Sequence, residues 1–288
     1  MKIIKLPNLD NAEIKTKEYN KPKFNAPIFQ PYSRVSLSGS SGTGKSNAFI
    51  NLFEKMYNDL DRVFVVSATI HNDPKQSQAF IGRENVMVFD NPSVELFKEI
   101  ITMIDEINQQ HKDYLAFMKV YKKWIENDME QAYLRPSELV LLYKYDFDPS
   151  KLPYNKETRP NILLFLDDLQ GLDLISGNGK GGQVFNNFII KARHKSCNVF
   201  LTSQTWKGVS PVWRRNCSGF MIFKTIDMNQ LKAIFEEIQG LFKSYDEFLE
   251  YYNFATDEKH NFLYIDMNDK TSPIRKNFNM VLSTGSTK

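Results

Sequence analysis

The run Gly39-Ser40-Ser41-Gly42-Thr43-Gly44-Lys45-Ser46 limits most strongly what this chain can fold into. A short β-type run, residues 35–38, precedes it, and apolar residues at helical spacing follow it: Phe49, Leu52, Phe53 and Met56. Glycines in such a loop let backbone N–H groups turn towards phosphates, and the next helix presents the positive end of its dipole. A strand, a glycine loop and a helix in this order predict a phosphate-binding site.

Each part of this run has an expected role. Gly39, Gly42 and Gly44, with Ser40, Ser41 and Thr43 between them, are expected to form the backbone cradle. Lys45 is expected to neutralise the β- and γ-phosphates of a nucleotide. The Ser46 hydroxyl is expected to bind Mg²⁺, which prefers hard oxygen ligands. The sequence therefore predicts ATP and Mg²⁺ as cofactors.

Two acids directly follow the apolar run 162–166. Unpaired carboxylates at the end of a buried strand must be solvated or bound, so an ordinary strand rarely ends in this way. Hydrolysis of Mg-nucleotide needs one carboxylate near the metal and a second group that polarises the attacking water. We assign the first role to Asp167 and the second to Asp168. Gln204, after the strand 199–203, is a candidate for contacting the γ-phosphate or its water, although an exposed amide is an equal alternative.

The rest of the pattern predicts strands that alternate with helices. Apolar runs rich in branched residues predict buried strands at 62–67, 85–89, 162–166, 198–203 and 220–223. The expected fold is therefore a three-layer α/β/α arrangement around a mostly parallel sheet. Two separate apolar stripes predict two helices, at 97–107 and 114–124, and the glycine-rich segment 171–182 predicts a loop.

Three parts of the chain are expected from composition. Residues 1–31 carry four of the prolines and little periodicity, which predicts an extended N-terminal arm. Residues 32–226 are expected to form the ATPase core, with a proline-broken insertion at 129–160. Residues 227–288 are expected to add one or two helices and a strand at 262–265 before a polar tail.

Charge, cysteine content and hydropathy exclude several classes. A net charge of +3 does not by itself indicate nucleic-acid binding, so any basic surface must be local. Cys197 and Cys217 lack metal or redox spacing and are expected to be reduced packing thiols. No run is long and apolar enough for a membrane helix or a secretory signal. We expect a soluble protein that is not secreted.

Several basic residues allow two interpretations. Arg193 lies near the end of a helix predicted at about 184–194, and Arg215 ends a short helix predicted after Pro211. Cations at helix ends favour the helix dipole. Alternatively, one of these arginines reaches the γ-phosphate in a neighbouring subunit and stabilises the transition state. Lys180 lies in the glycine-rich segment, which could face a DNA backbone or serve only as a connector.

Three segments in order resemble viral genome-packaging ATPases of the FtsK/HerA superfamily, of the poxvirus and virophage type. They are the phosphate loop, the strand ending in Asp167-Asp168, and the segment 192–204 with the later pair Arg215-Asn216. The resemblance covers roughly residues 33–225. It implies a RecA-like core and a homo-oligomeric ring, a pentamer or hexamer, that drives double-stranded DNA into a preformed capsid at its vertex. It also implies that Gln204 is a polar sensor and that an arginine acts between subunits. The implied location is the virus factory in the host cytoplasm, or transiently the capsid.

Other classes of protein also contain a phosphate loop of this kind. A nucleotide or nucleoside kinase would carry an arginine-rich lid, but the segment 129–160 holds only Arg135 and Arg159. An ABC-type ATPase would place its glycine-rich signature before the acidic strand, whereas here that segment follows Asp168. A nucleotide switch would need no water-orienting acid. The main alternative is therefore a kinase, or another P-loop ATPase that does not act on DNA.

Overall fold

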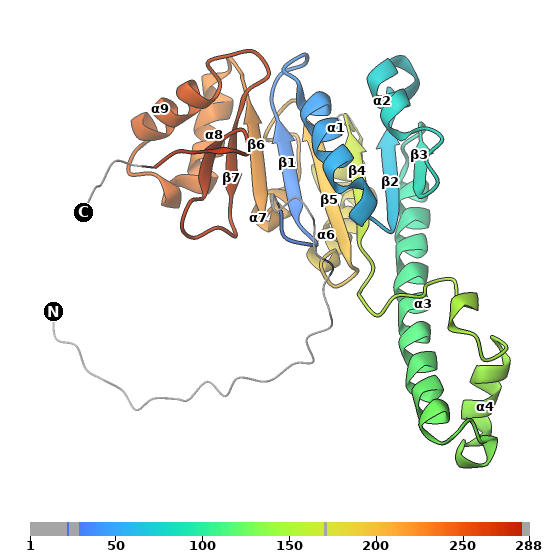
Figure 1. Ribbon diagram of the computed structural model, residues 1–288. Coiled ribbons are helices and arrows are strands. Elements are labelled where there is room, and N and C mark those ends of the chain that lie inside the picture. Colours follow the sequence, from blue (N-terminus) through green and yellow to red (C-terminus); the bar gives the residue numbers. More distant parts are fainter. Residues whose placement is uncertain (1–21, 23–28, 170–171, 284–288) are drawn as a thin grey trace, which may run out of the picture.

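The computed structural model describes residues 22, 29–169 and 172–283 (Figure 1). Within them a nine-stranded sheet runs in the order β3-β2-β4-β5-β1-β6-β7-β8-β9. The strands are β1 Arg34–Ser38, β2 Arg62–Ser67, β3 Val86–Phe89, β4 Ile162–Asp167, β5 Cys197–Ser203, β6 Gly219–Phe223, β7 Phe262–Asp266, β8 Ile274–Lys276 and β9 Met280–Val281. The helices are α1 Lys45–Met56, α2 Pro74–Phe80, α3 Val94–Glu126, α4 Pro136–Tyr143, α5 Asp173–Ser176, α6 Gly179–Lys191, α7 Pro211–Asn216, α8 Met228–Ile238 and α9 Tyr245–Ala255. The predicted arm at 1–31 lies almost wholly outside the described residues.

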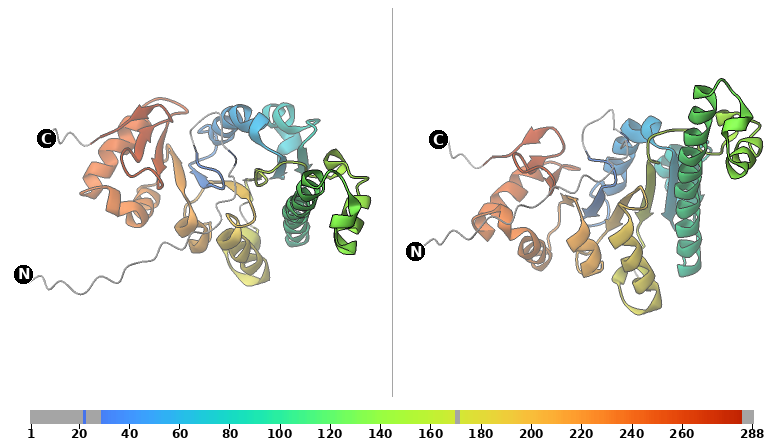
Figure 2. Two further views of the ribbon diagram at one scale, coloured as in Figure 1. Left: turned by 60° about the horizontal axis from the view of Figure 1, so that its bottom comes forward. Right: turned by 90° about the horizontal axis from the view of Figure 1, so that it is seen from below.

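Helices cover both faces of the sheet (Figure 2). Along β4, Leu163 and Phe165 pack with α1 and α2, whereas Leu164 and Leu166 pack with α3 and α6 on the other face. This alternation follows from the two-residue repeat of a strand, and burial on both faces explains why β4 is apolar throughout. The predicted three-layer α/β/α fold with a mostly parallel sheet is confirmed.

Strand order brings the distant motifs together. β1 pairs in parallel with β5 on one side and with β6 on the other, and β4 pairs in parallel with β5. The carboxyl ends of these strands therefore meet at one edge of the sheet, where ligands of such folds bind. The residues that follow β1, β4 and β5 all lie at this edge.

The C-terminal part extends the same sheet. β7 pairs antiparallel with β6, and β8 and β9 continue the antiparallel order. The predicted helices and the strand near 262–265 are confirmed as α8, α9 and β7. β8 and β9 were expected to be polar tail, because both are too short to show an alternating pattern.

The two helices predicted at 97–107 and 114–124 are wrong, because α3 is one continuous helix of 33 residues. No glycine or proline interrupts residues 94–126, so nothing in the sequence stops the helix. Its first half packs Phe97, Ile100 and Ile104 on the sheet, and its second half projects beyond the core (Figure 1). The apolar stripe changes direction because the two halves have different partners.

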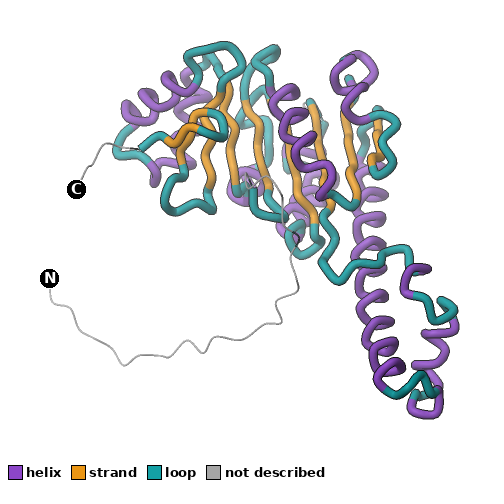
Figure 3. The backbone as a smooth tube through the Cα atoms, viewed as in Figure 1, coloured by secondary structure: helices purple, strands orange, loops and turns teal. Residues whose placement is uncertain are grey.

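The projecting half of α3 lies beside the segment that contains α4 (Figure 3). Side chains of this half and of residues 134–152 form a separate small core. This core contains Tyr114, Phe117 and Val120 from α3, with Leu142 from α4. The predicted insertion 129–160 supplies the second side of this helical arm. The division of the chain into an N-terminal arm at 1–31, an ATPase core at 32–226 and a C-terminal extension at 227–288 stays a prediction.

The glycine-rich loop predicted at 171–182 is also wrong in its described part, which holds α5 and the first turn of α6. A Cβ added at Gly182 would lie 2.2 Å from the Gly177 carbonyl carbon, and one at Gly181 would lie 2.7 Å from a Val94 methyl group. These glycines are therefore required for close packing between α6 and its neighbours.

Candidate active site

The phosphate loop lies between β1 and α1, as the motif predicts. Gly42 and Gly44 have φ values of 74° and 101°, which side chains rarely adopt. A Cβ at Gly39 would lie 2.6 Å from Phe223 Cβ at the end of β6. The three glycines therefore set the backbone path of the cradle and its close approach to the sheet.

Lys45 folds back over this loop. Its Nζ donates to the Gly39 carbonyl at 2.7 Å and to the Ser40 carbonyl at 2.9 Å. Burial lowers the pKa of Lys45, while the nearby Asp168 and Asp167 carboxylates act in the opposite direction. The ammonium group is therefore held at the mouth of the cradle, within the field of both acids.

Asp167 is 3% exposed at the end of β4. Its Oδ1 accepts from Thr202 Oγ1 at 2.6 Å, and its Oδ2 accepts from Gln76 Nε2 at 2.8 Å and from Ser67 Oγ at 3.3 Å. Burial raises the pKa of this carboxyl group, and these three hydrogen bonds act against the rise. The side chain is thus fixed in one orientation by groups from β5, α2 and β2.

Asp168 leaves the strand in a left-handed conformation, with φ 49°. Its backbone N–H donates to Thr202 Oγ1 at 2.9 Å, and its carboxylate accepts from Gln204 Nε2 at 3.0 and 3.2 Å. The structure therefore joins the two polar groups predicted to act on the attacking water, although they are 36 residues apart in the sequence.

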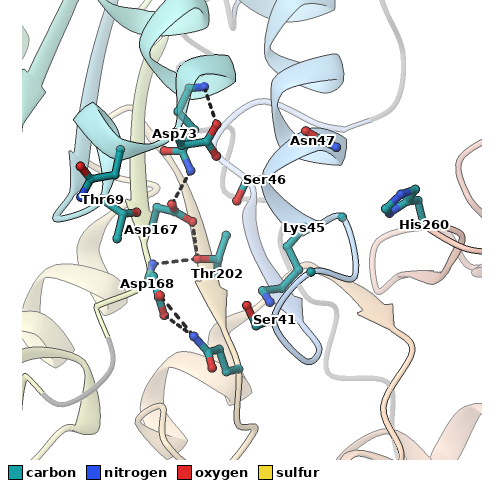
Figure 4. A pocket seen from close by; sticks show the side chains of 15 residues that line it. Ser41, Lys45, Ser46, Asn47, Thr69, Asp73, Asp167, Asp168, Thr202 and His260 are labelled. Carbon is teal, nitrogen blue, oxygen red and sulfur yellow. Dashed lines mark hydrogen bonds between the residues drawn. The ribbon is translucent and has the colours of Figure 1, made fainter.

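These groups line one cavity of about 400 Å³ (Figure 4). Asp167 and Asp168 lie on one side of the cavity, and the side chains of Lys45 and Ser46 reach towards them from the phosphate loop (Figure 4). Gln204 is hydrogen-bonded to Asp168. Asn47, Thr69, Asn72, Asp73, Gln76, Thr202 and His260 complete the lining together with loop residues. A nucleotide bound by the cradle would have its terminal phosphate among the acids.

The donor set fits Mg²⁺ bound with a nucleotide. The hydroxyl of Ser46 and the carboxylate of Asp167 are hard oxygen donors that face the same cavity. Mg²⁺ in such sites takes one or two protein ligands and completes its octahedron with phosphate oxygens and water. Among the described residues no group of three or more His, Cys, Asp or Glu side chains forms a metal cage.

The two candidate arginines do not reach this cavity in their own chain. Arg193 lies between α6 and β5, and Arg215 lies in α7 before β6, so both precede strands whose carboxyl ends form the site. Both side chains are exposed. They lie towards the opposite edge of the sheet.

Sequence reasoning missed Ser67, Gln76, Thr202, Asp73 and His260. Ser67 and Thr202 are polar residues at the ends of apolar strands, and this signal is readable once the strands are known to be neighbours. Ser67 pairs with Asp167 in the β2–β4 register. Asp73 caps α2 by accepting from the Lys75 and Gln76 N–H groups at 2.9 and 3.3 Å, which orients the helix that carries Gln76.

Both cysteines are buried and unpaired, and burial raises the pKa of each thiol. This agrees with the expected packing role. No helix among the described residues is long and apolar enough to cross a membrane.

Comparisons with known proteins support the fold. No family model matches the sequence, and no curated protein matches it. The genome packaging NTPase B204 from Sulfolobus turreted icosahedral virus 2, in complex with AMPPCP, superposes with a TM-score of 0.50 at 14% identity over 88% of this chain and 100% of B204. B204 from Sulfolobus turreted icosahedral virus, described as a DNA-packaging ATPase, has a TM-score of 0.47 at 12% identity over 83% of this chain and 95% of that chain. EssC from Geobacillus thermodenitrificans has a TM-score of 0.43 at 16% identity, covering 70% of this chain and 34% of that chain. The predicted resemblance to genome-packaging NTPases is confirmed in the fold.

Proposed function

We propose that this protein is a Mg²⁺-dependent ATPase that translocates double-stranded DNA into a preformed viral capsid as part of a homo-oligomeric ring. The observation that carries the proposal is the single cavity in which Lys45, Ser46 and Asp167 converge with Asp168 and Gln204. This set contains a cation for the phosphates, two metal donors and a paired acid and amide for water.

The proposed hydrolysis uses these groups in turn. Lys45 exchanges its two carbonyl partners for the β- and γ-phosphate oxygens when ATP enters the cradle. Ser46 and Asp167 hold Mg²⁺, which neutralises charge on the phosphates when it is bound. Asp168 accepts the proton of the attacking water, and Gln204 orients that water by its amide. The bond between Asp168 and Gln204 keeps both groups directed at the same point.

The DNA part of the proposal is supported by a local excess of positive charge. Between residues 172 and 226 the sequence contains one acid, Asp173. Arg214 pairs with Glu237 and Lys195 pairs with Asp105, whereas the remaining cations have no ion pair among the described residues: Lys180, Lys191, Arg193, Lys207, Arg215 and Lys224. All six of these are exposed. Cations without protein partners are available to neutralise DNA phosphates.

Helix α6 presents part of this charge as a stripe. Lys180, Gln183, Asn187 and Lys191 are exposed at helical spacing and include no acid. A sequence-independent contact with a duplex requires such groups directed at the backbone.

The ring, its pentameric or hexameric state and the capsid vertex are the finer parts of the proposal. B204, a genome packaging NTPase by its description, shares the fold, and its likeness motivates these parts. The host-cell virus factory, or the capsid during packaging, would be the place of action. In a ring, exposed Arg193 or Arg215 would lie against the cavity of the neighbouring subunit.

ATP-dependent displacement of a triplex-forming strand from a long DNA duplex tests translocation. We expect the wild type to displace the strand and Lys45→Ala to fail. Lys180→Glu combined with Lys191→Glu should weaken duplex binding about tenfold or more, and the effect should shrink as salt rises. The matched reversal of Lys112 and Lys119, two exposed cations on the projecting half of α3, should leave binding unchanged. Displacement without ATP, or equal loss from both reversals, would contradict the proposal.

A further inference from the structure

His260 belongs to the C-terminal part of the chain but lines the same cavity as the phosphate loop. It lies between α9 and β7. Because β7 is antiparallel to β6, it begins at the carboxyl edge of the parallel strands, and its first residue Phe262 pairs with Phe223. Phe223 is the residue that Gly39 approaches. The start of β7 is therefore beside the phosphate loop.

The contact between His260 and the loop is close. His260 Nδ1 lies 3.3 Å from the Thr43 carbonyl oxygen. A Cβ added at Gly44 would lie 2.7 Å from the same nitrogen, so the histidine occupies space that only a glycine leaves open. The imidazole is thus held directly over Gly44, the residue that precedes α1.

The backbone keeps His260 in an uncommon conformation. Its φ of 72° lies in the left-handed region, where residues other than glycine are strained. Asn277 fixes this turn, since its Oδ1 accepts from the Phe262 N–H at 3.2 Å and its Nδ2 donates to Asn261 Oδ1 at 3.0 Å. Asn261 in turn donates to Glu258 Oε2 at 3.1 Å. Strain that the surroundings maintain in this way is common at ligand sites.

The orientation that we propose for ATP determines what His260 would contact. With the terminal phosphate beside Asp167 and Asp168, the nucleoside would leave the phosphate loop on the side away from these two acids. Figure 4 shows His260 on the opposite side of the phosphate loop from the two acids. A flat aromatic ring at the nucleoside end can stack on a purine base.

We propose that His260 is a nucleoside-recognition residue whose imidazole stacks on the purine of the bound nucleotide. This inference rests on the proposed ATP site and assigns a task to the C-terminal part of the chain. The histidine contributes to binding and has no part in the hydrolytic step.

The test compares two ligands that differ only in the nucleoside. Affinities for Mg-ATP and for Mg-tripolyphosphate are measured for the wild type, His260→Ala and His260→Phe. We expect His260→Ala to weaken ATP binding about tenfold, in the range known for base–aromatic stacking, and to leave tripolyphosphate binding unchanged. His260→Phe keeps a ring and should restore most of the ATP affinity. His194→Ala, which removes an exposed histidine near the opposite edge of the sheet, is the matched control.

The outcomes separate the two proposals. A wild type that binds neither ligand would overturn the ATP site itself. Equal weakening of both ligands by His260→Ala would overturn nucleoside recognition, because the histidine would then act only through the phosphate loop. Unchanged ATP affinity in His260→Ala would overturn it as well. Steady-state kinetics should agree, with a raised KM for ATP and a kcat within about twofold of the wild type.

Discussion

The Thr202 hydroxyl donates to the Asp167 carboxylate at 2.6 Å and accepts the backbone N–H of Asp168 at 2.9 Å. One side chain on β5 therefore orients both acids at the end of β4. The hydrogen bond to Asp167 fixes the orientation of the carboxylate that we propose to face the metal. The hydrogen bond from the Asp168 N–H holds the turn that directs Asp168 towards Gln204.

Replacing Thr202 by valine keeps the shape and removes both hydrogen bonds. We expect the apparent affinity for Mg²⁺ in ATP turnover to fall about 10- to 100-fold, as is usual when a partner of a metal ligand is lost. A Mg²⁺ titration of turnover measures this. Thr102→Val, on the exposed surface of α3, is the control and should behave as the wild type. An unchanged Mg²⁺ dependence in Thr202→Val would show that Asp167 needs no such support.

Asp167→Asn should abolish turnover and yet stabilise the nucleotide-free protein. Burial raises the pKa of Asp167 above that of the unfolded chain, so the folded state binds protons more readily and stability falls as pH rises through this range. The amide avoids this cost. Rotation of the Gln76 amide by half a turn would replace its Nε2, which now donates to Asp167, by Oε1, a buried atom without a partner in the described residues, and Oε1 could then accept from the new N–H. Thermal melting should show a Tm raised by about 2–4 °C for each kcal/mol gained. The gain should disappear at low pH, where the carboxyl group is protonated; a lower Tm at neutral pH would refute the argument.

Gly182→Ala should destabilise the fold, because its Cβ would lie 2.2 Å from the Gly177 backbone. Overpacking of this kind costs about 1–3 kcal/mol, which urea unfolding can measure. Gly240→Ala is the matched control, since a Cβ there meets no atom within 4 Å. Equal stability of the two variants would mean that α6 can shift away from α5 at little cost.

Subunit mixing tests whether an arginine acts in a neighbouring subunit. Lys45→Ala removes ATP binding but retains both arginines, whereas Arg193→Ala and Arg215→Ala retain the cavity. If one arginine acts in trans, the alanine variant of that arginine should have little or no ATPase activity by itself. Mixing it with Lys45→Ala should recover part of the activity, because the Lys45→Ala subunit supplies the arginine to the intact cavity of its neighbour. The variant that shows recovery identifies the arginine. Additive activities in both mixtures would argue against a role in trans.

The local parts of the site are predictable from the sequence and the assembled parts are not. Lys45, Ser46 and Asp167 lie within short motifs whose spacing predicts a phosphate and metal site. Gln76 and Thr202 reach Asp167 only because β2, β4 and β5 are neighbours in the sheet. The order of strands in a sheet cannot be predicted from any one segment of the sequence. His260 lies far outside the recognised motifs and reaches the loop only through the antiparallel pairing of β7.

The errors in the predicted fold have the same origin. The stripe of α3 was divided in two because its halves face different partners, a tertiary feature that periodicity does not reveal. The glycine content of 171–182 predicts a loop, but Gly181 and Gly182 lie in α6, where packing against Val94 and Gly177 requires them to be small. The parallel strands were predictable because burial on both faces leaves a continuous apolar run.

ATP hydrolysis by the wild type and by Asp168→Asn, each with and without long double-stranded DNA at several salt concentrations, tests the central claim most directly. We predict that DNA raises wild-type turnover, that this stimulation fades with salt, and that Asp168→Asn lowers turnover about 100-fold or more while still binding ATP. If DNA does not change the rate of wild-type ATP turnover, and turnover occurs only with a small phosphate acceptor, the protein is not a DNA motor. That result would indicate a kinase.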